Sequence, residues 1–124
     1  MTGQLARVHG EWLLMVHEHG RESLVATRHV QSIRGLGRYS SPSTTQSTVD
    51  LRFGLNLALR RVARERSPVR LHLVDGVIDG TIDRVGSDFC DVALHAANEP
   101  RRRGTVREVA LVPIAALVAA TRAA

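Results

Sequence analysis

Short apolar runs separated by polar turns occupy the first part of the chain. Residues 12–16 are continuously apolar, which is typical of a strand buried on both faces. The polar stretch at 17–22 predicts a hairpin turn, and shorter β-like runs follow at 23–26 and 29–33. This pattern predicts a group of short strands with few residues between them.

A second β-like region begins after Pro68. Residues 69–74 alternate between apolar and polar side chains, as a half-buried strand does, and Asp75-Gly76 is a pair typical of hairpin turns. Polar residues then separate several further runs. We expect strands at 77–85, 88–94, 106–112 and 116–119, with a tight turn at 113–115.

Between the two β regions the apolar spacing becomes helical, over residues 48–66. Ser47 is a candidate N-cap for this helix, and Pro68 is a terminator. A wide apolar stripe along the predicted helix consists of Leu51, Leu55, Ala58, Leu59 and Val62. A narrower second stripe consists of Val49, Phe53 and Leu57. A helix that is apolar on two sides has two surfaces to pack on, so the narrower stripe is a candidate oligomer interface.

The two β regions resemble each other in sequence. Residues 3–12 align without gaps on residues 80–89, and residues 22–25 align on residues 109–112. In both regions an Arg-Val pair ends the first strand and an acidic residue precedes an aromatic one. We therefore interpret the two aromatic residues, Trp12 and Phe89, as equivalent core side chains.

These elements predict a mainly β fold with one helix, built from two small β-barrel repeats of which the first is incomplete. The first copy has no counterpart of the helix and strand at 48–74. We divide the chain into an incomplete first repeat (1–37), a flexible linker (38–47), a central helix (48–66) and a second small barrel (67–124).

The order of elements over residues 48–119 resembles that of Sm-like and SH3-like small barrels, and the run from Val69 to Leu94 looks like the first half of an Sm motif. The chain is also similar to a family of uncharacterised actinobacterial proteins. They share the pattern Gly-Thr-Ile-Asp-Arg-Val-Gly-x-Asp-Phe and a C-terminal Val-Pro-x-x-Ala-Leu. The Asn with which Sm proteins contact RNA is absent near Cys90 and Asp91, and no Arg-Gly pair follows the fourth strand. The resemblance therefore implies a fold and no activity.

Composition excludes several kinds of chemistry. All 17 basic residues are Arg, which together with the many Ala indicates a GC-rich genome and removes lysine-based chemistry such as a P-loop. The single cysteine excludes an internal disulfide and any multi-cysteine metal site. The N-terminus has no secretory pattern and no apolar stretch reaches membrane-spanning length, so we expect a cytoplasmic protein.

Three groups of residues could carry chemistry, and each has a simpler interpretation. His17 and His19 could be metal ligands, but no third ligand is placed near them, and a solvated hairpin turn explains them. Asp88 and Asp91 lie on opposite faces of a strand, which does not suit a catalytic pair. Cys90 has no activating partner and fits a core position. We predict no catalytic, cofactor-binding or metal residues and no small-molecule substrate.

The net charge of +5 suggests partners of another kind. Positive charge is concentrated on the predicted helix and around the polar loop, at Arg60, Arg61, Arg64, Arg101, Arg102, Arg103 and Arg107. Our leading hypothesis is a non-enzymatic interaction or scaffold module that forms a homodimer or higher oligomer, because an incomplete first repeat leaves an open sheet edge. The alternative is weak, electrostatically driven binding of RNA or DNA of the Sm-like type through these arginines.

Overall fold

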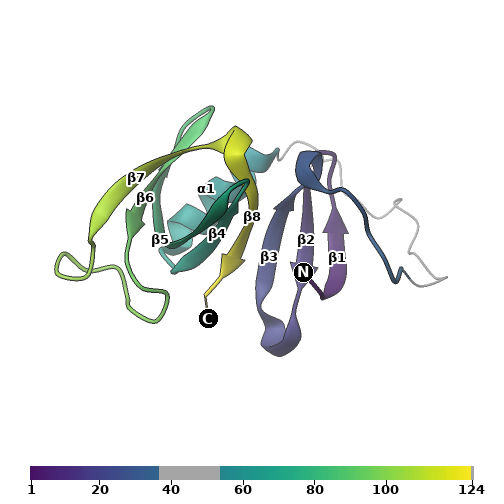
Figure 1. The fold of residues 1–124 in the computed structure, drawn as a ribbon, viewed down its shortest axis with the longest axis horizontal. Coiled ribbons are helices and arrows are strands. Elements are labelled where there is room, and N and C mark those ends of the chain that lie inside the picture. The colour runs from purple at the N-terminus through teal and green to yellow at the C-terminus, as the bar shows by residue number, and fades with distance from the viewer. Residues whose placement is uncertain (37–53, 124) are drawn as a thin grey trace.

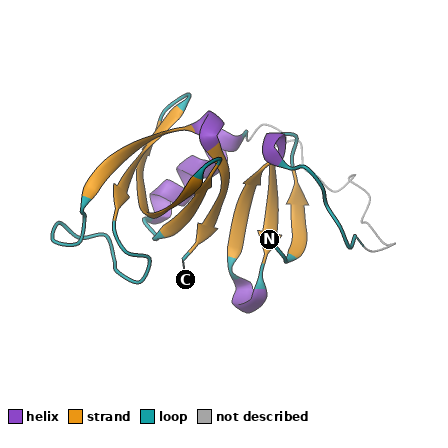
Figure 2. Cartoon of the chain, in the orientation of Figure 1, coloured by secondary structure: helices purple, strands orange, loops and turns teal. Residues whose placement is uncertain are grey.

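The computed structural model describes residues 1–36 and 54–123, and in these residues the protein is mainly β with one α-helix. The strands are β1 (Gln4–Val8), β2 (Trp12–Val16), β3 (Glu22–Ala26), β4 (Val69–Leu73), β5 (Gly76–Val85), β6 (Phe89–Leu94), β7 (Glu108–Pro113) and β8 (Leu117–Arg122). The helix is α1 (Leu55–Glu65), and three 3-10 turns are η1 (Glu18–Gly20), η2 (Thr27–His29) and η5 (Ile114–Ala116) (Figures 1 and 2).

All eight described strands belong to one antiparallel sheet with the order β1-β2-β3-β8-β4-β5-β6-β7. The predicted pair of small barrels is therefore not what the strands build. The last strand, β8, pairs with β3 on one side and with β4 on the other, so the edges that could have closed two separate units join them into one open sheet. Figure 1 shows the half formed by β4 to β8 curving around α1, beside the flatter group β1 to β3.

Most strands lie where the sequence pattern predicts them, but residues 29–33 do not form the expected strand. His29 ends the turn η2, and residues 30–36 lie outside any described ladder; they are exposed apart from the half-buried Val30. A strand at this place would pair with β3 in a meander. That edge of β3 is already occupied, since Ser23, Leu24 and Val25 pair with β8.

The helix α1 begins at Leu55, after Gly54 in extended backbone, and not at residue 48 as the spacing predicted. A carboxylate from the first β region holds its start. Glu11 Oε2 accepts a hydrogen bond from the Leu55 N–H at 2.8 Å, which satisfies one of the free donors of the first turn. Gly54 precedes it, where an added Cβ would come within 2.7 Å of the same oxygen. The helix ends at Arg66, which adopts the left-handed conformation with φ of 56°. Residues 37–53, including Ser47, Val49, Phe53 and the expected linker, lie outside the described residues.

Two groups of three strands share one hydrogen-bonding register. We call β1–β2–β3 the first meander and β5–β6–β7 the second meander. Leu5 pairs with Met15 and Ile82 pairs with Val92, and in each case the register then shifts by one residue before an arginine. Trp12 pairs with Ala26 as Phe89 pairs with Pro113. A 3-10 turn follows each meander, at η2 and at η5. The sequence alignment of the two regions thus matches residue for residue in the backbone pairing.

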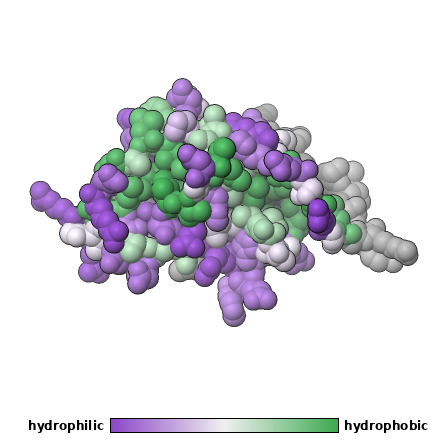
Figure 3. Space-filling view, in the orientation of Figure 1, coloured by the Kyte–Doolittle hydropathy of each residue, from purple (hydrophilic) through white to green (hydrophobic). Residues whose placement is uncertain are grey.

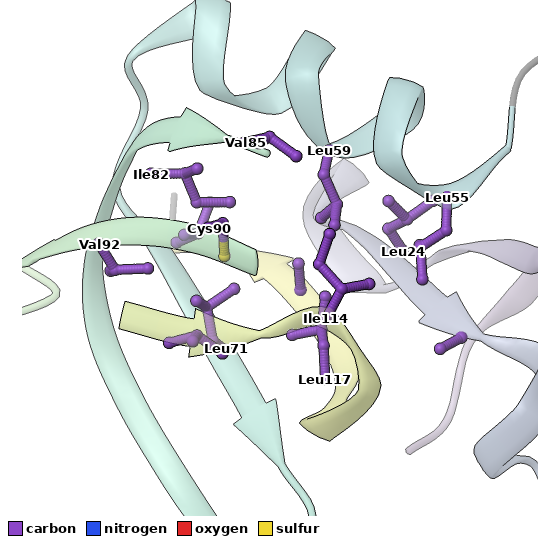
Figure 4. Close-up of a cluster of buried hydrophobic side chains, with 14 of the residues drawn as sticks. Leu24, Leu55, Leu59, Leu71, Ile82, Val85, Cys90, Val92, Ile114 and Leu117 are labelled. Carbon is purple, nitrogen blue, oxygen red and sulfur yellow. The ribbon is translucent and has the colours of Figure 1, made fainter. Parts of the chain in front are cut away.

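The main hydrophobic core lies between α1 and the sheet. Leu59 of the helix and Leu71, Ile82 and Leu117 of the strands are at most 1% exposed. Figure 4 shows Leu55 and Leu59 directed from α1 towards these side chains, with Leu24 of the first meander beside Leu55. The described members of the wide apolar stripe, Leu55, Ala58, Leu59 and Val62, therefore pack in this core. A smaller cluster of Leu13, Val25 and Ala119 lies on the other face of the first meander.

Candidate interaction surface

The strand β7 forms one end of the sheet, and among the described strands it pairs only with β6. Its side chains alternate between the core and solvent. Val112 is 3% exposed and Ala110 packs against the core, whereas Val109 is 62% exposed and Leu111 is 64% exposed. Figure 3 shows apolar side chains gathered on the face where Figure 1 draws β7, with hydrophilic residues around them. We call the outward backbone of β7 together with Val109 and Leu111 the β7 edge.

The backbone of β7 has hydrogen-bonding groups that no described strand uses. The Ile114 N–H donates to Asp88 O at 2.8 Å, so the backbone groups of Ile114, and in the same register those of Val112 and Ala110, face β6. Because these groups alternate along an antiparallel strand, the N–H and C=O of Val109 and Leu111 point away from β6. Pro113 occupies the next outward position, where it supplies a C=O but no N–H. The β7 edge therefore presents two backbone donors, with a proline at the end of the strand.

Charged residues beside the β7 edge are largely paired within their own sheet. Asp91, which pairs with Leu111 across the ladder, forms an ion pair with Arg84 at 3.3 Å. The Arg84 guanidinium also lies 5.2 Å from the centre of the Phe89 ring. The expectation that Phe89 is a core residue holds less well than for Trp12, since Phe89 is only half-buried and Trp12 is 8% exposed.

The predicted arginine cluster is divided between α1 and the loop that precedes β7. Arg101 does not contribute a free charge, because it binds Asp83 with two hydrogen bonds of 2.7 and 3.0 Å. Arg66 reaches the same carboxylate at 3.6 Å, which brings the loop towards the end of α1. Arg102, Arg103 and Arg107 are exposed and have no ion pair within the described residues.

The Thr105 hydroxyl also helps to hold the loop around these arginines. Thr105 Oγ1 accepts a hydrogen bond from the Arg102 N–H at 3.0 Å and donates to Pro100 O at 2.8 Å. On the helix, Arg60 Nε lies 3.4 Å from Val85 O, and Arg61 and Arg64 are exposed. Leu57 is half-buried on α1, and its predicted companions on the narrow stripe fall outside the described residues.

One histidine expected in a solvated turn, His17, is half-buried and instead belongs to a chain of hydrogen bonds that runs through the buried Ser23. His17 Nδ1 lies 2.6 Å from Thr2 O, which can only accept, so this nitrogen donates. His17 Nε2 then accepts from the Ser23 hydroxyl at 2.6 Å, and Ser23 Oγ lies 2.7 Å from Thr121 Oγ1. Ser23 is completely buried, so this His–Ser pair is closed to a substrate. This chain of hydrogen bonds joins the end of β2 to β3 and β8. Sequence analysis did not find it, because Thr121 is far from His17 and Ser23 in the sequence.

Of the other candidate groups, Asp88 is exposed and Asp91 pairs with Arg84, whereas Cys90 is buried in the core, as is His95, a further residue that could carry chemistry. His95 Nε2 lies 2.7 Å from Thr81 Oγ1, and both residues are buried. Burial, followed by the nearby Asp91 carboxylate, raises the pKa of the Cys90 thiol to about 11, which suppresses its reactivity. Within residues 1–36 and 54–123, no group of three or more potential ligands could hold a metal ion.

A cavity of about 210 Å³ lies between α1 and the first meander. Its apolar lining includes Trp12, Leu24 and Val62, and Glu65 and Arg122 form an ion pair at its margin. Arg7 and Arg61 also line it.

No protein-family model, no curated protein and no solved structure matches this chain. Of the helices in the described residues, none has the length and apolar character needed to cross a membrane.

Proposed function

We propose that this protein is a non-enzymatic interaction or scaffold module that self-associates in the cytoplasm. The observation that carries the proposal is the β7 edge, where two large aliphatic side chains more than 60% exposed accompany unused backbone donors. An exposed edge strand is a template for pairing with another chain, and folded proteins cover or block edges that are not used for pairing. On β7 the features that oppose pairing are Glu108 at one end and Pro113 at the other.

The two meanders support a second part of this proposal, that the chain contains two copies of one small β unit of the Sm-like or SH3-like kind. The support is the matching register, including a bulge at the same place in each copy. Bulges are specific features of a fold, so their agreement favours a common origin over chance.

Size-exclusion chromatography with light scattering, over a series of micromolar concentrations, tests self-association directly. We expect a mass of two chains or more that falls towards one chain on dilution. A mass of one chain at every concentration would contradict the proposal.

The exposed arginines of the β6–β7 loop support a second candidate function, weak binding of RNA or DNA. Arg102 and Arg103 are adjacent in the sequence, Arg107 follows in the same loop, and all three are exposed; the helix adds Arg60, Arg61 and Arg64. Electrostatic binding of this kind weakens steeply as salt rises. Titration of labelled single-stranded RNA and duplex DNA at low and moderate salt tests it.

A matched pair of variants sharpens that titration. Arg102→Ala with Arg103→Ala should weaken binding and reduce its salt dependence, whereas Arg101→Ala should change it less because Arg101 is neutralised by Asp83. If neither nucleic acid binds at low salt, the candidate function is wrong.

A further inference from the structure

The self-association proposed above leaves open which surface is used and which partner strand it meets. We propose that β7 pairs antiparallel with β7 of a second copy of this chain about a two-fold axis at Ala110, with Val109 opposite Leu111 of the second copy. This inference rests on the proposed function and specifies its interface. It would join the two sheets into one continuous sheet.

The backbone of the β7 edge is complementary to itself in this arrangement. Val109 and Leu111 each present an outward N–H and an outward C=O. Pairing Val109 with Leu111 of the second copy lets both residues exchange two hydrogen bonds, and the two-fold axis repeats the pair. Pro113, which lacks an N–H, then lies beyond the paired residues, and the Arg107 N–H is not required because it already donates to Leu94 O at 2.8 Å.

The side chains select the same register. Residues directly opposite one another lie on one face of a sheet, so the exposed Val109 and Leu111 of the two copies would form one four-residue apolar cluster. A shift of the axis to Val109 would place Leu111 opposite Arg107, and a shift to Leu111 would place Val109 opposite Pro113. The first alternative places a charged side chain against Leu111, and the second leaves the outward C=O of Val109 without a donor, because Pro113 has no N–H.

Charge also permits this pairing. Like charges directly opposite each other destabilise a strand pair. With the axis at Ala110, Glu108 lies opposite Val112 of the second copy and far from the other Glu108. The nearby Asp91 is already compensated by Arg84. The pairing therefore removes no ion pair that the described residues form.

A charge placed on the β7 edge tests whether this surface is used. Leu111→Arg should raise the dissociation constant of the dimer at least about tenfold, because a charge would enter the apolar cluster twice per dimer. Leu111 is 64% exposed in the single chain, so the variant should fold normally. The matched control is Val77→Arg, at a valine 54% exposed near the start of β5, which should leave the dissociation constant unchanged.

A cysteine at the axis tests the register. Ala110→Cys should give a covalent dimer on mild oxidation, because residues facing each other across such an axis have Cα atoms about 4.5 Å apart, within disulfide range. Glu108→Cys is the control, since two copies of residue 108 would lie about 13 Å apart along the strands. The native Cys90 should not compete, because it is completely buried.

The outcomes separate this inference from the proposed function. A wild-type protein that is monomeric at every concentration overturns both. A wild-type dimer that Leu111→Arg leaves intact overturns the β7 interface while self-association stands. If Leu111→Arg dissociates the dimer but Glu108→Cys cross-links and Ala110→Cys does not, the register is wrong. The inference is supported in full if Leu111→Arg dissociates the dimer and Val77→Arg does not, and if Ala110→Cys cross-links and Glu108→Cys does not.

Discussion

Leu24 and Leu111 occupy equivalent places in the two meanders, opposite Leu14 on β2 and Asp91 on β6, yet Leu24 is 8% exposed and Leu111 is 64% exposed. The difference lies in what covers each meander. β3 is followed in the sheet by β8, and the face of the first meander that carries Leu24 packs against α1. In the part of the chain that the structure describes, β7 has no such neighbour.

The residues before the two aromatic positions show the same contrast. The Glu11 carboxylate accepts from the first turn of α1, whereas the Asp88 side chain at the equivalent position makes no hydrogen bond or ion pair with the described residues. Two segments with one hydrogen-bonding pattern therefore have different roles, because the pattern of pairing within a meander does not decide which of its faces is buried. Comparing equivalent substitutions in the two meanders tests this conclusion.

The largest expected difference is between Leu24→Arg and Leu111→Arg. Leu24→Arg would bury a charge without a partner and should cost at least about 3–5 kcal/mol. Since a small domain is stable by only about 5–15 kcal/mol, much of the stability should be lost. Leu111→Arg should change the stability of the single chain by less than about 0.5 kcal/mol.

Urea unfolding of both variants, at the lowest protein concentration that gives a signal, measures this difference with little contribution from self-association. Similar unfolding midpoints would show that the two meanders have similar surroundings, contrary to the structure.

The helix that separates the two environments provides the next comparison. Leu55 of α1 is 4% exposed and packs in the core, so Leu55→Ala should lower the free energy of unfolding by about 2–5 kcal/mol. Arg64→Ala, on the exposed side of the helix, should change it by less than about 0.5 kcal/mol. The melting temperatures of the two variants measure this difference. Equal shifts would contradict the assignment of Leu55 to the buried face of α1.

A smaller effect is expected from the two acidic residues. Glu11→Ala removes the carboxylate that accepts from the Leu55 N–H, and should cost about 1–2 kcal/mol, as loss of a helix cap does. Asp88→Ala should cost less than about 0.5 kcal/mol, because its side chain is exposed and only its backbone C=O accepts from Ile114. Thermal unfolding distinguishes the two, and an equal loss from Asp88→Ala would contradict the assignment of the cap to Glu11.

The smallest effect near neutral pH concerns Cys90, which occupies the place that Leu13 holds in the first meander. Burial raises the pKa of the folded thiol from 9.0 to about 11. The folded protein therefore retains the proton more strongly than the unfolded chain. This contribution to stability is complete below pH 9.0 and is lost as the pH rises through 9.0 to about 11.

Urea unfolding of the wild type and Cys90→Ala as a function of pH measures this contribution. We expect the difference in free energy between the two proteins to shrink over that alkaline range. A constant difference would mean that the thiol titrates alike in both states.

The sequence by itself determined the local elements. The alternation at 69–74 and the Asp75-Gly76 pair predicted β4 and its turn to within a residue or two, and helical spacing predicted α1. The similarity of the two β regions could also be found in the sequence, because the alternation of side chains and the turn residues depend only on neighbouring positions. Burial of Leu55 followed from the same spacing and is confirmed.

Tertiary structure alone decided how these elements are joined. The choice of β8 as the partner of both β3 and β4 brings together residues far apart in the chain, and local patterns carry no information about such pairings. For the same reason the strand expected at 29–33 is absent. His17 bonds to the buried Ser23, and Glu11 accepts from the first turn of the distant helix α1. The β7 edge belongs to this second class. Residues 109–112 are continuously apolar, a pattern that does not tell which side chains are exposed, and only the tertiary structure leaves Val109 and Leu111 uncovered at the end of the sheet.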